Sequence, residues 1–218
     1  MQPIIIPLHP VTPEQRYVGL IAERIHSGNL LLYPSDTGMA FGCALRNKAA
    51  IERIRRIRNL KETKLMTFLC PSLSNLAEYA LVSNRAYRII RRLVPSPITF
   101  ILPATKAVPS YAHDPTRRTV GVRVPRATIP RSILDACGQP LISITARRSD
   151  DERLLSPEQA VEEFGAFVDC VVTVQHHSWY HEPLFAGPST VLDLTGDEPI
   201  IVRVGADIEI VEEVLAQL

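Results

Sequence analysis

Apolar residues recur at helical spacing in several stretches of the chain. Val18, Ile21, Ala22 and Ile25 follow one another at the intervals that place side chains on one face of a helix. This pattern predicts a helix over residues 14–27. The same signals, together with capping residues, predict helices over residues 48–60, 72–79, 84–93, 130–137, 156–164 and 211–218.

Apolar runs that are too short for helices lie between these segments. We place the end of the first run at Tyr33, because Pro34 follows it. Strands are predicted over residues 30–33, 65–70, 99–102, 119–124, 141–145, 170–174, 189–194 and 200–204. Since several strands follow one another directly while others alternate with helices, we expect an α/β fold whose sheet mixes parallel and antiparallel pairs.

Composition narrows the class of protein. The 218 residues, 46% of them hydrophobic, are enough to bury a full core, and we expect one domain over residues 1–218. The cysteines at positions 43, 70, 137 and 170 fall singly among apolar neighbours, as in a reducing compartment. The apolar run at residues 4–6 is short, and nothing approaches the roughly 18 apolar residues of a membrane span. We therefore expect a soluble, cytoplasmic protein with no membrane partner.

Positive charge is concentrated in one part of the chain. Residues 46–64 contain eight cations and two anions, whereas the whole chain has a net charge of only +1. Such a local surplus on a balanced background indicates a positioned patch that binds anions.

Arg58 lies on the core-facing side of the helix predicted over residues 48–60. At about 100° per residue it projects between Ile51 and Ile54. A buried cation needs an anionic partner. Two alternatives remain: Arg58 reaches past the core edge or pairs with a structural carboxylate, or it binds a ligand phosphate.

Asp36 and Thr37 follow a predicted strand and precede Gly38, a position where α/β sheets place ligand contacts. Structural capping of the turn is the alternative function for Asp36.

Arg123 is a lone arginine within the apolar strand predicted over residues 119–124. A bidentate clasp on a carboxylate is the physical use of a guanidinium in such a setting. An arginine facing water from an edge strand is the alternative.

Seven segments of the chain form a recognisable series. They are PSDTGMAFGC (34–43), RIRRIRNLKETKLM (53–66), SPITFILPA (96–104), TVGVRVP (119–125), PLISITA (140–146), GPSTVLDL (187–194) and IIVRVG (200–205). Taken in this order, they resemble the YrdC/Sua/YciO family of threonylcarbamoyl-adenylate synthases and their relatives, from about residue 14 to residue 205. The Thr-Gly-x-Ala-x-Gly-Cys turn and the arginine-rich helical stretch over residues 53–58 bring the chain closest to the YciO branch.

The resemblance implies a twisted, open α/β domain with a positive concave face that binds nucleotide and, in some members, RNA. It also implies an activity that joins L-threonine, bicarbonate and ATP into threonylcarbamoyl-AMP and pyrophosphate, for modification of adenosine in tRNA. Mg²⁺ is expected to enter with ATP, with no metal ligand from protein side chains.

The resemblance assigns residues to these ligands by position. It places Thr37, Arg123 and Ser189 at threonine or a similar amino acid, and Arg58, Lys61, Lys64, Ser143, Thr145 and Arg203 at nucleotide and phosphate.

Four positions depart from the family pattern. Met39 replaces an aromatic residue, Leu60 an arginine of the basic loop, Leu65 a proline and Arg147 an asparagine. Since one preorganised donor is worth roughly 3 to 4 kcal/mol in a transition state, the activity is expected to be weak or redirected unless Lys61 or Arg147 substitutes for the missing groups.

A non-catalytic protein that binds double-stranded RNA or tRNA is the alternative from another functional class. Arg55 and Arg56 face away from the apolar side of their helix and would contact the phosphate backbone. His177 and His181 have the spacing of a helical metal pair, but no helical pattern surrounds them, so we expect no metal there.

Overall fold

The computed structural model describes residues 2–60, 65–148, 154–175 and 187–217. The strands are β1 (Ile4–Leu8), β2 (Leu31–Ser35), β3 (Gly38–Ala44), β4 (Thr67–Leu69), β5 (Ile98–Pro103), β6 (Thr119–Arg123), β7 (Leu141–Thr145), β8 (Cys170–Val174), β9 (Thr190–Asp193) and β10 (Ile200–Arg203). The helices are α1 (Gln15–His26), α2 (Lys48–Ile57), α3 (Leu73–Tyr79), α4 (Asn84–Leu93), α5 (Thr128–Cys137), α6 (Pro157–Phe164) and α7 (Ile208–Ala216), with a 3₁₀ turn at Gly165–Phe167.

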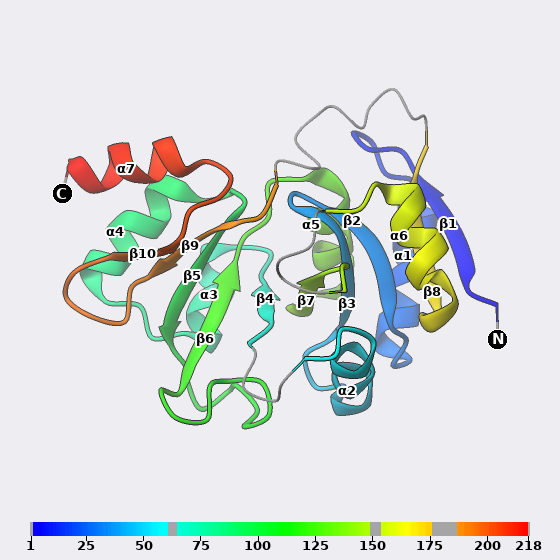
Figure 1. Ribbon diagram of the computed structural model, residues 1–218, viewed down its shortest axis with the longest axis horizontal. Helices are drawn as coiled ribbons and strands as arrows, with labels where there is room; N and C mark the ends of the chain where they lie inside the picture. Colours follow the sequence, from blue (N-terminus) through cyan, green and yellow to red (C-terminus); the bar gives the residue numbers. More distant parts are fainter. Residues whose placement is uncertain (1, 61–64, 149–153, 176–186, 218) are drawn as a thin grey trace.

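The described strands form one ten-stranded sheet in the order β1-β8-β2-β3-β7-β4-β6-β5-β9-β10 (Figure 1). The pairs β1–β8, β2–β8, β4–β6 and β5–β9 are parallel. The pairs β2–β3, β3–β7, β4–β7, β5–β6 and β9–β10 are antiparallel. The predicted α/β class and mixed sheet are therefore confirmed.

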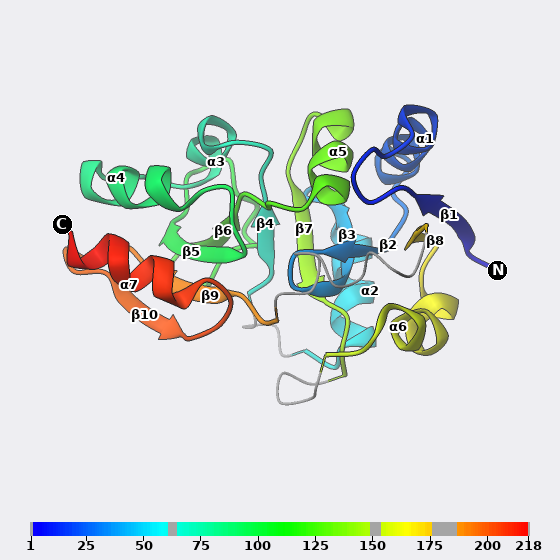
Figure 2. The same ribbon diagram turned by 90° about the horizontal axis from the view of Figure 1, so that it is seen from above.

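Two hydrophobic cores lie on the two faces of the sheet. Helices α1 and α5 contribute their buried residues to one core, which also contains the inward side chains of β1, β2 and β8. Helices α2, α3, α4, α6 and α7 contribute to the other. Figure 2 shows α1 and α5 on one side of β2 and β3, with α2 and α6 on the opposite side. Within the described residues, no helix has the length and apolar character needed to cross a bilayer.

The predicted end of the first strand at Tyr33 is wrong. Strand β2 continues through Pro34, which pairs with Met39 of β3, and ends at Ser35. Strand β8 pairs with β2 only at Leu31 and Leu32. Beyond that point one edge of β2 has no described partner strand, and a residue that lacks an N–H group is tolerated there.

Strands β1 and β3 were not predicted. The isoleucines of β1 show no alternation of apolar and polar residues, and pairing with β8 alone makes them a strand. Strand β3 has two glycines and two alanines, which are poor strand formers. It is buried because β2 and β7 pair with it on both sides, so tertiary context decides its conformation.

Gly205 lies where the chain after β10 passes against the start of β9. A Cβ atom added to Gly205 would lie 2.2 Å from the Pro188 carbonyl oxygen and 2.6 Å from the Ser189 carbonyl carbon. The neighbouring Ala206 N–H donates to the Pro188 oxygen at 2.8 Å, which fixes this approach. Only glycine fits, and the contact holds Ser189 beside the last strand.

Gly205→Ala should therefore lower the free energy of unfolding. The methyl group would meet backbone atoms that cannot rotate away, and overpacking of this kind costs about 1–3 kcal/mol. Urea denaturation of both proteins measures the difference.

Gly196→Ala is the matched control. An added Cβ there has its nearest neighbour, the Glu198 carbonyl oxygen, at 4.0 Å. This variant should stay within about 0.5 kcal/mol of the parent. Equal midpoints for the Gly205 and Gly196 variants would contradict the close approach.

Candidate functional site

The face of the sheet that α1 and α5 cover continues as the floor of a cavity. Paired residues of neighbouring strands point to the same face. Leu69 pairs with Leu141, and both belong to the core beneath α1 and α5. Leu69 also pairs with Arg123, which lines a cavity of about 410 Å³. The cavity therefore lies on this face, where β4, β6, β5, β9 and β10 follow the part that α1 and α5 cover.

Most of the site residues predicted from the sequence meet in this cavity. Those that line it are Thr37, Arg58, Arg123, Ser143, Thr145, Ser189 and Arg203. Lys61 and Lys64 lie outside the described residues, as do His177 and His181. Arg55 instead lines a separate recess of about 10 Å³, and Arg56 is exposed. RNA binding through these two arginines stays a prediction.

A chain of hydrogen bonds crosses one end of the cavity. Arg123 donates from Nη1 to Thr37 Oγ1 at 3.2 Å, and from Nε and Nη2 to Thr99 Oγ1 at 3.2 and 3.1 Å. Thr99 Oγ1 lies 3.2 Å from Ser189 Oγ. Arg203 donates to Ser189 Oγ at 2.6 Å and to its carbonyl oxygen at 2.8 Å. Five side chains from different parts of the sheet thus form one polar wall.

Arg123 is buried at 7% exposure on β6, which lies between β4 and β5. The alternative of a water-facing arginine on an edge strand is therefore wrong. Burial lowers the pKa of Arg123, while the negative charge of Asp36 opposes this shift. Arg203 adds a second positive charge nearby. The wall is thus a desolvated, positively charged surface, which favours an anionic ligand.

Thr37 is placed by a tight turn between β2 and β3. Only Asp36 and Thr37 separate the paired residues Ser35 and Gly38. Gly38 has φ of +104°, a conformation that favours glycine, and Ser35 Oγ donates to its carbonyl oxygen at 2.7 Å. This geometry presents the Thr37 hydroxyl to the cavity.

Asp36 has a structural role in that turn. Its carboxylate accepts from the backbone N–H groups of Ala127 at 2.5 Å and Arg126 at 3.3 Å, at the start of α5. It is fully buried, and this burial raises its pKa, although Arg123 and the two N–H groups act in the opposite direction. The turn-capping alternative for Asp36 agrees with these contacts.

Arg58 and Arg147 line the cavity apart from this wall. Arg58 caps the end of α2, is 2% exposed and donates from Nη1 to the Arg147 carbonyl oxygen. Its predicted core-facing direction is confirmed. Arg147 follows β7 and is 8% exposed. Two nearly buried guanidinium groups thus line this part of the cavity.

Ser143 also lines the cavity and is held there by a contact with a core residue. Its hydroxyl lies 2.7 Å from the hydroxyl of Tyr33, whose pKa is raised by burial. The Tyr33 ring lies against Gly42, where an added Cβ would meet it at 2.6 Å. The ring therefore needs the glycine opposite it.

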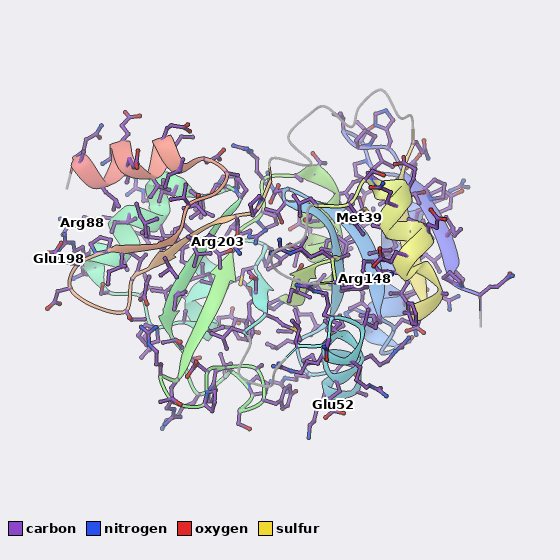
Figure 3. The ribbon with its side chains drawn as sticks, in the orientation of Figure 1. Met39, Glu52, Arg88, Arg148, Glu198 and Arg203 are labelled. Atoms are coloured by element: carbon purple, nitrogen blue, oxygen red, sulfur yellow. The ribbon has the colours of Figure 1, made fainter. Side chains whose placement is uncertain are left out.

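The four departures from the family pattern fall into two groups. Met39 is buried in the larger core, and Leu60 packs against the same core. Leu65 and Arg147 line the cavity. Figure 3 labels Met39 and Arg148 in the half of the sheet that holds β2 and β3, and Arg203 beside β9 and β10.

Thr99 is the residue of this wall that was not predicted from the sequence. A threonine in a strand is ordinary, and its role becomes visible only when β5 and β6 pair and bring it to Arg123. The available signal was its position as a lone hydroxyl within the apolar run over residues 98–102.

The described lining does not form a magnesium site by itself. It provides hydroxyl and guanidinium groups and no carboxylate. No group of three or more His, Cys, Asp or Glu residues suited to a metal occurs in the described part of the chain. Mg²⁺ prefers carboxylate, phosphate and water oxygens, so these side chains alone do not fit it.

Comparison with known proteins gives the family. The Sua5/YciO/YrdC family model, described as telomere recombination, matches residues 23–205. The uncharacterized protein YciO of Escherichia coli K12 is 37% identical over 199 residues, which are 91% of this chain and 93% of the relative. The chain belongs to the Sua5/YciO/YrdC family. Its resemblance to the YciO branch, seen in the sequence, is confirmed.

Solved structures agree with this assignment. The crystal structure of E. coli YciO matches with a TM-score of 0.86 at 34% identity, over 95% of this chain and 98% of that one. Pyrococcus abyssi Sua5 complexed with L-threonine matches with a TM-score of 0.86 at 24% identity, over 99% of this chain and 62% of that one. The second likeness shows the fold alone. The threonylcarbamoyl-AMP synthase of P. abyssi is a distant homologue, 24% identical over 207 residues, which are 94% of this chain and 59% of the relative.

The pKa shift of Asp36 predicts a pH dependence of stability. Because its pKa is raised in the folded state, the folded protein binds this proton more tightly than the unfolded chain. Its contribution to stability is full below the unfolded pKa and is lost as the pH rises through the folded pKa. Relative to Asp36→Asn, the wild type should therefore lose stability as the pH rises above about 4, as measured by urea denaturation.

Asp169 provides a control of opposite sign. Burial tends to raise its pKa, but hydrogen bonds from Arg53 at 2.6 Å and from the Leu30 N–H at 2.8 Å outweigh burial and lower the pKa. Relative to Asp169→Asn, the wild type should lose stability as the pH falls through the folded pKa. The same slope for both pairs of proteins would refute the assignment of Asp36.

Proposed function

We propose that the cavity binds L-threonine and ATP and joins them with bicarbonate into threonylcarbamoyl-AMP and pyrophosphate. The observation that carries this proposal is the bonding of Arg123. Three of its five side-chain N–H groups donate to hydroxyl oxygens, and no described residue accepts from the other two. No described carboxylate forms an ion pair with it.

A buried guanidinium with two N–H groups to spare is suited to a carboxylate ligand. Its planar fork matches the two oxygens of a carboxylate, and the charge that burial destabilises is then compensated. Ser189 and Thr37 add hydroxyl groups beside it. This end of the cavity is therefore the proposed amino-acid site.

The other arginines suit a polyphosphate. Arg58 and Arg147 would bind the β- and γ-phosphates, and Ser143 and Thr145, which line the same cavity, would donate from their hydroxyl groups to the nucleotide. Arg203 donates to Ser189 in this structure and thus belongs to the polar wall. The contact with phosphate that the sequence predicted for Arg203 is not part of the proposal.

In the proposed reaction, the amine of L-threonine and bicarbonate form a carbamate and release water. A carbamate oxygen attacks the α-phosphorus of ATP, the bond from this phosphorus to the bridging oxygen breaks, and pyrophosphate leaves. Arg58 and Arg147 stabilise the negative charge that gathers on the leaving group. Mg²⁺, held by the phosphates and water, supplies further neutralisation when it enters with ATP.

The comparisons support this choice of reaction. A distant homologue is named threonylcarbamoyl-AMP synthase, and a protein of the same fold has been solved with L-threonine. The more similar relative, E. coli YciO, has no activity in its name. The volume of about 410 Å³ is of the size of sites for small molecules.

The direct test measures pyrophosphate release from ATP with Mg²⁺ and bicarbonate, with and without L-threonine, and detects threonylcarbamoyl-AMP by mass. Arg123→Ala should lower kcat/KM for L-threonine by about 30-fold or more, since truncating one partner of a buried charge pair costs 2–5 kcal/mol. The affinity for ATP should change little.

Arg131→Ala is the control for charge, because Arg131 is an exposed cation on α5. It should keep the activity of the parent. Turnover that depends on L-threonine and is unchanged in Arg123→Ala would show that the carboxylate site is misplaced. Wild-type protein that binds ATP but shows no turnover would contradict the proposed activity.

Arg147→Asn, which restores the family residue, should weaken the binding of ATP and of pyrophosphate by about 10- to 100-fold. A hydrogen bond to a charged group contributes about 1.5–3 kcal/mol, and Leu60 provides no cation that could replace it. Isothermal titration calorimetry with both ligands measures the effect.

The neighbouring residue is the matched control. Arg148 is 71% exposed at its side chain and pairs with Glu163 at 2.5 Å. Arg148→Asn removes the same charge one residue away and should leave both affinities within about twofold. Equal losses of affinity in both variants would mean that the two arginines act on the ligands through long-range electrostatics, and that Arg147 does not contact the ligands directly.

A further inference from the structure

The hydroxyl protons of the polar wall have directions that follow from the bonds around them. A hydroxyl group has one proton to donate and two lone pairs that accept. Thr99 Oγ1 accepts from Nε and from Nη2 of Arg123, so both of its lone pairs are in use. The Thr99 proton can then only be donated, and Ser189 Oγ is the oxygen within reach at 3.2 Å.

The same count applies to Ser189. Its Oγ accepts from Thr99 and from Nη2 of Arg203 at 2.6 Å, which occupies both lone pairs. The Ser189 proton must therefore point away from Thr99 and Arg203. No described residue accepts it, and Ser189 lines the cavity at 2% exposure. Ser189 is thus oriented as a donor toward whatever the cavity holds.

We infer that Thr99 is a positioning residue that sets the polarity of the amino-acid site. It turns the Ser189 hydroxyl into a donor, so that Ser189 and the two spare N–H groups of Arg123 offer only donors to the cavity. A ligand group that binds them must accept every bond. The site therefore takes α-amino acids with a free carboxylate and selects against amides, whose NH₂ group would meet a donor.

This inference rests on the proposed function and goes beyond it, because it names the group that the site recognises and the residue that arranges the recognition. The Thr99 hydroxyl has no donor or acceptor left for a substrate in this arrangement. It acts through Ser189, with which it shares a hydrogen bond, and through Arg123, whose guanidinium it holds in place.

The experiment measures the binding of L-threonine and of L-threonine amide by calorimetry, with ATP binding measured separately. Thr99→Val keeps the shape and removes the hydroxyl. It should weaken L-threonine binding by about tenfold or more, as for loss of a hydrogen bond to a charged group, and should reduce the preference for L-threonine over its amide. ATP affinity should stay within about twofold of the wild type.

Thr99→Ser keeps the hydroxyl and should retain the preference for the carboxylate. Thr119→Val is the control for the chemical change, because Thr119 is also buried, on the adjacent strand β6, but does not belong to the polar wall. It should leave both affinities unchanged. If Thr99→Val does not fold, Ser189→Ala removes the same donor and should reduce the same preference.

The outcomes separate the two proposals. Wild-type protein that binds no L-threonine would overturn both. Wild-type protein that binds L-threonine, with an unchanged preference for the carboxylate in Thr99→Val, would overturn the role of Thr99 and leave the proposed function standing. Equal losses of L-threonine and ATP affinity in Thr99→Val would indicate general damage and would also overturn it.

Discussion

The site depends on one constraint, the burial of a positive charge in the middle of a sheet. Arg123 occupies a central strand, where a guanidinium loses its water. Hydroxyl groups compensate part of that loss, because Thr37 and Thr99 come from strands or turns that surround β6. Asp36 adds electrostatic compensation, but the pKa of Arg123 is still lowered, so the compensation is incomplete. The charge of the polar wall and the carboxylate preference that we propose for it both depend on this residue.

Positive charge is also distributed differently from the family pattern in the part of the cavity that we propose for phosphate. Leu60 stands where the family has an arginine, and it packs against the core. Arg147 stands where the family has an asparagine, and it lines the cavity. One cation is thus absent from the loop after α2 and one is present after β7. Since a polyphosphate responds to the total field in a desolvated site, exchange of this kind conserves charge while changing its geometry.

The sequence was sufficient for the class of fold and for much of the site, because strong helical periodicity and a lone charge in an apolar strand are each compatible with few structures. Arg58 and Arg123 were predicted from such patterns. Strand β3 was not predicted, since its glycines and alanines have no strand preference of their own. Thr99 was missed for a related reason. The hydrogen-bond partner of its hydroxyl lies on the neighbouring strand, and the order of the strands is a property of the whole sheet.

The place of β10 at the edge of the sheet affects how constantly the Ser189 hydroxyl keeps one orientation. Strand β10 pairs with β9 and is the last strand in the order, so it can detach locally at a lower free energy than the central strands. Arg203 belongs to this strand and supplies one of the two bonds that orient Ser189. Each local opening of β10 would free a lone pair on Ser189 and let its proton rotate. The selectivity of the proposed amino-acid site would thereby depend on how often this edge strand opens.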